Sequence, residues 1–143
     1  MPYRYLEDIA TADVAFEVWG DTLEEMFAAA AAAAMNVMVS DLNAIARVEL
    51  RTLQATAEEL DMLLFELLQE LIFYKDAEQL LLRVPTVHIE AQPGQFSLRA
   101  EAYGEEIDPE KHDLIVDIKA VTLHRFKVEQ TARGWEATVI LDI

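Results

Sequence analysis

The sequence has 143 residues, with 27 acidic side chains against 11 basic ones and a formal net charge of −16. This balance disfavours extensive direct RNA binding, because nucleic-acid affinity rests on Lys and Arg displacing counterions from phosphates. The chain has no cysteine, which excludes a disulfide framework and a thiolate site and leaves the cytoplasm as the default location. The acidic surface suits a cation or a basic surface on a protein partner, or it only keeps the protein in solution.

The length fits one domain, expected to span residues 1–143. The longest apolar run, Met26 to Met35, is well short of the roughly 20 residues that a membrane-spanning helix needs. Acidic residues precede this run, unlike the short basic segment of a signal peptide. We therefore expect no membrane span and a mature protein that starts at or near Met1.

Two strands are predicted at the beginning of the chain. Residues 3–6 form a short strand, and residues 13–19 form a strand with a clear period of two. In that second strand, Asp13, Ala15 and Glu17 alternate with the apolar side chains of Val14, Phe16 and Val18. Asp13 therefore stands at the entrance of a strand.

Two helices are predicted in the first half of the chain. One runs over about residues 22–39: Thr22 and Glu25 have the spacing of a capping box, and seven consecutive alanines, residues 28–34, favour close packing on a sheet. A strand follows at 46–55, with Val48 and Leu50 on one face. The second helix, about residues 57–75, carries a broad apolar arc at helical spacing, made by Leu60, Leu63, Leu64, Leu67, Leu68, Leu71 and Ile72.

The second half of the chain returns to a period of two. Short strands at 79–83 and 86–91 are interrupted by Pro85, and a turn at 92–94 leads into a strand over 96–103. A polar loop over 104–113 precedes a last hairpin, residues 119–130 and 135–142. Strands around two helices predict an α+β domain, with both helices on one face of a mainly antiparallel or mixed sheet.

Little in the sequence supports covalent catalysis. There is no cysteine, no Gly-x-Ser-x-Gly elbow and no glycine loop for phosphates. Carboxylates are abundant, and Ca²⁺ and other hard cations bind six to eight oxygens. The spacing alone, however, favours Asp13 as a turn-capping residue and Asp142 as part of a solvated terminus over a metal site.

Four sequence blocks, in order along the chain, resemble the archease family of small acidic proteins that assist RtcB-type RNA ligases. They are Thr11-Ala12-Asp13 with Trp19 to Glu25, Gly104-Glu105 with Asp108 to His112, Lys119 to Thr122, and the closing Asp142-Ile143. The family commonly has a histidine three residues before its first aspartate, where this sequence has Ala10.

The resemblance implies a divalent cation, Ca²⁺ or another, held by Asp13, Asp142 and the carboxylate of Ile143. It implies that Lys119 is needed to assist the ligase and that His112 helps to shape the partner face. Surface residues are the alternatives: Lys119 at a strand edge and His112 in a loop.

The resemblance further implies a non-catalytic activator of an RtcB-type RNA ligase, which promotes guanylylation and multiple turnover of the ligase in tRNA splicing or RNA repair. Two alternatives stay open. The carboxylates could activate water in a metal-dependent hydrolase, although the sequence names no general base. The chain could also be a chaperone-like interaction module whose metal is structural.

Overall fold

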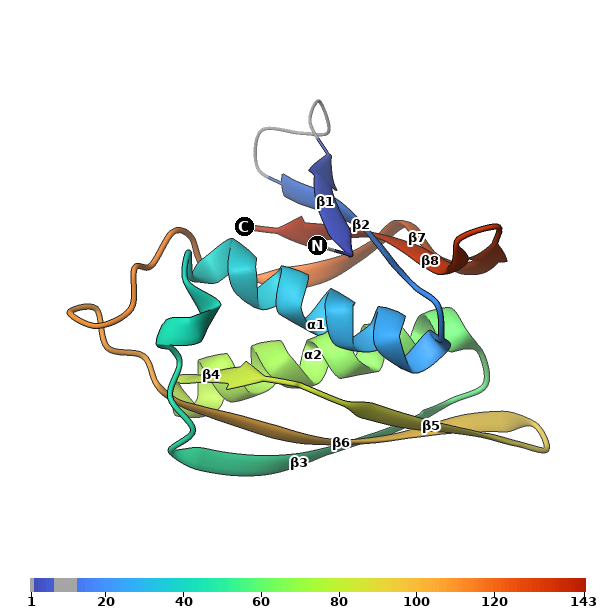
Figure 1. Ribbon diagram of the computed structural model, residues 1–143, viewed down its shortest axis with the longest axis horizontal. Helices are drawn as coiled ribbons and strands as arrows, with labels where there is room; N and C mark the ends of the chain where they lie inside the picture. Colours follow the sequence, from blue (N-terminus) through green and yellow to red (C-terminus); the bar gives the residue numbers. More distant parts are fainter. Residues whose placement is uncertain (1, 7–12) are drawn as a thin grey trace.

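Two antiparallel sheets enclose a layer of two helices in the computed structural model, which describes residues 2–6 and 13–143 (Figure 1). The first sheet has the order β1-β2-β8-β7, with bounds Tyr3–Leu6, Asp13–Gly20, Gly134–Asp142 and Ala120–Thr131. In the second sheet, β6 lies between β3 on one edge and β4 and β5 on the other, with bounds Gln95–Glu106, Glu49–Ala57, Leu80–Arg83 and Val87–Gln92.

The two helices are α1 (Leu23–Met38) and α2 (Leu60–Glu78), and a short 3-10 helix, η1 (Leu42–Ala44), follows α1. Helix α1 contacts β2 and β8 on one side and β4 and β5 on the other, whereas α2 contacts β7 on one side and β3, β4 and β6 on the other. Buried side chains from both helices and both sheets belong to one continuous core. In the parts of the chain that the structure describes, neither helix has the length and apolarity to cross a bilayer.

The predicted α+β class, with two helices and antiparallel strands, is confirmed, but the strands form two sheets where a single sheet was expected. The reason lies in the width of the apolar arc on α2. Phe65 packs edge-to-face against Phe126 of β7, while the Tyr74 ring faces Arg51 of β3. Because α2 buries two sides, it needs a sheet on each of them.

The alanine run packs closely against the first sheet, as predicted. Ala30 and Ala33 are fully buried, and the Tyr5 hydroxyl donates to the carbonyl oxygen of Ala33 at 2.8 Å. The predicted cap is also present, because the Thr22 hydroxyl accepts a hydrogen bond from the Glu25 amide at 3.1 Å. Small side chains thus let β1 approach the backbone of α1.

Strand β3 differs from the prediction in its bounds. It runs on to Ala57, which pairs with Phe96, so α2 begins at Leu60 and not near residue 57. Of the β3 side chains, Leu53 is the fully buried one, whereas Leu50, like Val48 just before the strand, is 65 % exposed. The outer face of the second sheet therefore carries solvent-exposed apolar side chains.

Candidate functional site at the Asp13–Asp142 end of the first sheet

The register between β2 and β8 is determined by the core. Apolar side chains on the inner face lie opposite one another, pairing Val14 with Leu141, Phe16 with Val139 and Val18 with Ala137. A slip of one residue would turn all of them out of the core, so burial holds this register strongly. The alternate residues then share the other face, and at its end Asp13 lies directly opposite Asp142.

This aspartate pair has the chemistry of a cation site. Both residues are partly buried, and like charges directly opposite each other on neighbouring strands destabilise a sheet. Ile143 follows Asp142, and the family resemblance implies its carboxylate as the third ligand. Such an all-oxygen donor set fits a hard divalent cation. Within the described ranges, no three acidic or histidine side chains gather as a metal site, so the fit depends on the α-carboxylate as the third ligand.

Lys119 adjoins the aspartate pair through its backbone. Its amide donates to the carbonyl oxygen of Asp142 at 2.8 Å, and the next residue, Ala120, lies opposite Asp142 in the register of β7 and β8. The Lys119 side chain is exposed. Four of the five predicted site residues, Asp13, Asp142, Ile143 and Lys119, therefore lie at one end of the first sheet.

Lys75 is a residue that the sequence reasoning missed. Its side chain is 5 % exposed in the last turn of α2, and its Nζ donates to the Ile118 carbonyl oxygen at 2.5 Å and to Asp117 Oδ1 at 2.7 Å. A buried ammonium group needs such partners. Lys75 therefore fixes the two residues before Lys119. The available signal was its position, three residues beyond Ile72 on the buried arc of α2.

His112, the fifth predicted site residue, lies away from the aspartate pair and is 1 % exposed. Its Nδ1 accepts from the Asp108 amide at 2.9 Å, which leaves Nε2 to carry the proton that it shares with Glu105 Oε2 at 3.0 Å. The ring therefore cannot touch a partner directly. It holds the loop after β6 in place, and a role in shaping a partner face remains a prediction.

Glu105 is the anchor of this loop. Its carboxylate accepts from Lys111 Nζ at 2.7 Å, from the Ala46 amide at 2.6 Å and from His112. The Lys111 ammonium group, followed by the Ala46 amide and then His112, holds the pKa of Glu105 at about 2, below its ordinary value of 4.5. The charged carboxylate thus joins β6, the 107–119 segment and the chain before β3.

We expect Glu105→Gln to lower the free energy of unfolding by about 1.5–3 kcal/mol at pH 7, since it removes charge-assisted hydrogen bonds. A folded-state pKa below the unfolded one means that the contribution is full above about pH 4.5 and is lost as pH falls towards 2. The difference in the free energy of unfolding between wild type and Glu105→Gln, measured by urea unfolding, should therefore narrow as the pH falls from about 4.5 towards 2. The exposed neighbour Glu106→Gln is the control, and a gap independent of pH would contradict the assignment.

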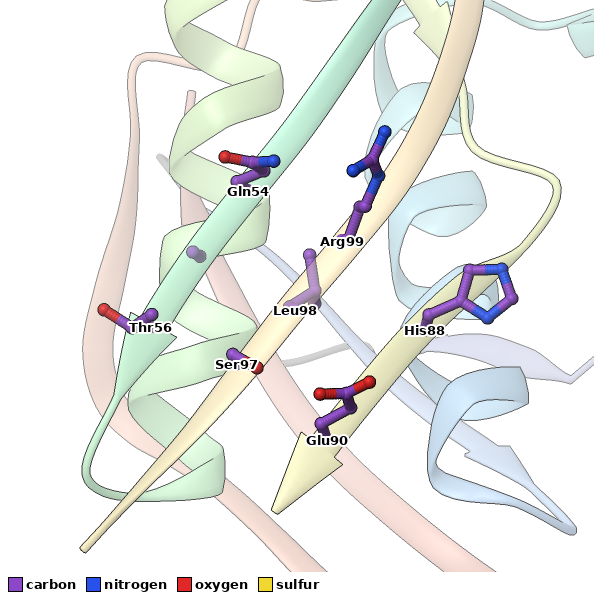
Figure 2. Close-up of a pocket in the computed structure, with 8 residues that line it drawn as sticks. Gln54, Thr56, His88, Glu90, Ser97, Leu98 and Arg99 are labelled. Atoms are coloured by element: carbon purple, nitrogen blue, oxygen red, sulfur yellow. The ribbon is translucent and has the colours of Figure 1, made fainter. Parts of the chain in front are cut away.

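A separate hollow of about 660 Å³ lies on the outer face of the second sheet (Figure 2). Gln54 and Thr56 of β3, Ser97 and Arg99 of β6, and His88 and Glu90 of β5 line it. Alternating polar residues are typical of the solvent face of an antiparallel sheet. His88 is exposed here, and none of the five predicted site residues lines this hollow. Ala10 lies outside the described residues.

Sequence comparison identifies relatives along nearly the whole chain. The model of the "Archease protein family (MTH1598/TM1083)" matches residues 3–143. The protein archease of Pyrococcus abyssi is 40 % identical over 134 residues, covering 93 % of this chain and 94 % of the relative. That of Methanosarcina acetivorans is 36 % identical over 142 residues, covering 99 % of this chain and 95 % of the relative.

Two solved structures share the fold. The solution structure of a Methanobacterium thermoautotrophicum protein has a TM-score of 0.85 and 34 % identity, covering 99 % of each chain. The crystal structure of an archease from Thermotoga maritima, described as a possible chaperone, has a TM-score of 0.56 and 19 % identity, covering 96 % of this chain and 97 % of the other. At that lower identity the likeness concerns the fold alone.

Proposed function

The chain belongs to the archease family, and from this premise we propose that it is a non-catalytic protein cofactor of an RtcB-type RNA ligase, promoting guanylylation and multiple turnover of the ligase in tRNA splicing or RNA repair. The observation that carries the proposal is the alignment of Asp13 with Asp142 beside the backbone of Lys119. These residues belong to three of the sequence blocks that resemble the family, and none of their side chains is needed by the core.

The proposal includes a divalent cation, Ca²⁺ in the first instance, bound by Asp13, Asp142 and the α-carboxylate of Ile143. When bound, the cation would supply positive charge that offsets the repulsion between the carboxylates. The chain's own contribution is the β2–β8 register, which places the two aspartates opposite each other. This preorganisation lowers the cost of binding.

A protein partner is favoured over RNA by charge. The net charge of −16 repels a phosphate backbone and attracts the basic surface that an RNA-handling protein carries. The description of the Thermotoga maritima archease as a possible chaperone is compatible with a protein partner. We also propose a cytoplasmic location, since a chain without cysteine suits a reducing compartment.

A hydrolase would need an open pocket and a general base beside the carboxylates. The hollow in Figure 2 is lined by residues of the second sheet, away from Asp13 and Asp142. No observation on the described residues therefore favours hydrolysis over the proposed role. The ligase assay distinguishes the proposed role from the other alternative, a chaperone-like module with a structural metal.

The test is RNA ligation by the RtcB-type ligase of the same organism, with RNA in excess over enzyme and with or without this protein at saturating concentration. We expect several ligations per ligase molecule with the protein and about one without it. The protein alone, incubated with the RNA and with generic phosphoester and peptide substrates, is the control and should show no turnover. Equal ligation with and without the protein would refute the proposed function.

A further inference from the structure

The segment that precedes Lys119 exposes three consecutive large apolar side chains. Leu114, Ile115 and Val116 are 42 %, 55 % and 38 % exposed. In the chain as described, residues 2–6 and 13–143, this is the only run of three neighbouring large hydrophobic residues at the surface. We call it the 114–116 segment. Clustered exposed apolar side chains with a polar rim mark interaction sites more often than scattered ones do.

The 114–116 segment is held rigidly from both ends, although it lies outside the named strands. On one side, the Asp113 carbonyl oxygen accepts from the Ser40 amide at 3.0 Å, and the Ile115 amide donates to the Met38 carbonyl oxygen at 2.8 Å. On the other side, Lys75 holds the Ile118 carbonyl oxygen. A backbone already ordered in this way loses little entropy when a partner binds.

The side chains of the 114–116 segment border a hollow of about 240 Å³. Its remaining lining is mostly apolar and comes from Met38, Leu81 and Ile107, with Lys75 and Asp117 at the polar side. Anchors of protein interfaces are apolar or aromatic side chains that fill hollows of this kind at the centre of the contact. The hollow thus has the chemistry to receive an apolar side chain.

Asp117 lines the hollow, and in the nearby 108–113 loop the acidic side chains outnumber the one lysine, Lys111. Asp113 and Asp117 flank the 114–116 segment and are exposed, and Asp108 and Glu110 lie in the loop before it. With a net charge of −16, a second copy of this chain would be repelled. Lys or Arg residues around the incoming side chain would instead be attracted, which favours a basic protein surface.

We propose that the 114–116 segment and its hollow form a docking surface for an apolar side chain, flanked by Lys or Arg, on the ligase. This inference rests on the proposed function. Val116 is three residues before Lys119, whose amide binds the Asp142 carbonyl oxygen. Docking at the segment therefore holds Lys119 and the aspartate pair against the same partner.

The test compares Ile115→Ser with Leu50→Ser, a control with similar exposure on the second sheet. Binding of the fluorescently labelled ligase and the concentration of this protein that gives half-maximal ligation are measured for each. Because Ile115→Ser removes an apolar anchor, it should lower the affinity for the ligase and raise the half-maximal concentration by about tenfold each. For the control, neither quantity should change by more than about twofold. Calcium titration should be unchanged in both variants.

Thermal unfolding checks that each variant is folded, and Ile115→Ala, a milder change, should weaken binding in the same direction. If wild type stimulates the ligase but Ile115→Ser binds it as tightly as wild type does, the docking surface is wrong and the proposed function stands. Concentration-dependent self-association of wild type that Ile115→Ser abolishes would assign the segment to a second copy and overturn the proposal. If wild type does not stimulate the ligase, both fail.

Discussion

Replacing Asp13 by alanine is expected to weaken Ca²⁺ binding by well over tenfold, since loss of a partner that only orients a ligand already costs about 10–100-fold in metal affinity. Asp13 would supply both charge and coordination, and Asp142 opposite it cannot replace those oxygens. Isothermal titration with Ca²⁺ measures the effect. Asp142→Asn should behave in the same way, because the two side chains form one pair.

Asp13→Ala should affect stability in the opposite direction to Ca²⁺ affinity. Without the cation, removing one of two opposed carboxylates relieves repulsion, so Asp13→Ala should keep or raise the free energy of unfolding by up to about 1 kcal/mol. Added Ca²⁺ should raise the melting temperature of wild type and not that of the variant. If Asp13 had only a structural role, the Asp13→Ala variant would instead be less stable than wild type both with and without Ca²⁺.

Glu17→Ala is the matched control for the titration. Glu17 lies four residues further along β2 on the same face, opposite Thr138, and its carboxylate pairs with Arg4 at 2.5 Å. Its removal changes the net charge as much as Asp13→Ala does but leaves the aspartate pair in place. Calcium affinity that falls equally in both variants would show a general charge effect, and unchanged affinity in Asp13→Ala would refute the site.

The sequence predicts the face on which Asp13 lies but not its partner. Alternation along residues 13–19 assigns Val14, Phe16 and Val18 to the core and Asp13 to the other face. The pairing of β2 with β8 joins residues more than a hundred positions apart, and no local pattern encodes such a pairing. The family resemblance, not the periodicity, singled out Asp142 in advance.

The division of the strands into two sheets could not be predicted from the sequence, for a related reason. Strand β6 is long enough for β4 and β5 to lie end to end along one of its edges, with Pro85 between them. Periodicity shows each strand separately and says nothing of which edge it joins. The breadth of the apolar arc on α2 was the one available sign that this helix is covered on two sides.

Buried polar residues were the hardest to predict. The position of Lys75 on the buried arc of α2 is the one local sign of its burial, and nothing in the local sequence distinguishes His112 from a surface residue. Their partners, Asp117 and Glu105, become known only from the tertiary structure. Each burial depends on a partner supplied by another element, and an unpaired ammonium or imidazole group there would be strongly destabilising. The part that both residues play in holding the 107–119 segment therefore emerges from the tertiary structure.

Lys119→Ala is expected to lower the maximal stimulation of the ligase by about tenfold or more while leaving the fold intact, because exposed substitutions usually change stability by no more than about 0.5 kcal/mol. The contact that anchors this residue is made by its backbone amide with Asp142, and alanine keeps it. Lys127→Ala is the matched control, since Lys127 is an exposed lysine further along β7 whose ammonium group pairs with Glu129 at 3.2 Å.

Titrating each variant against a fixed amount of ligase separates the maximal rate from the half-maximal concentration. A loss at saturation would mean that the Lys119 ammonium group acts within the complex, whereas a shift in the half-maximal concentration alone would make it a binding contact. Lys119→Arg keeps the positive charge but not the compact ammonium group, so it separates a requirement for charge from a requirement for an ammonium group. Full stimulation by Lys119→Ala would remove Lys119 from the functional surface. An equal loss of stimulation in Lys127→Ala would do the same, because positive charge on this part of the sheet in general would then account for the result.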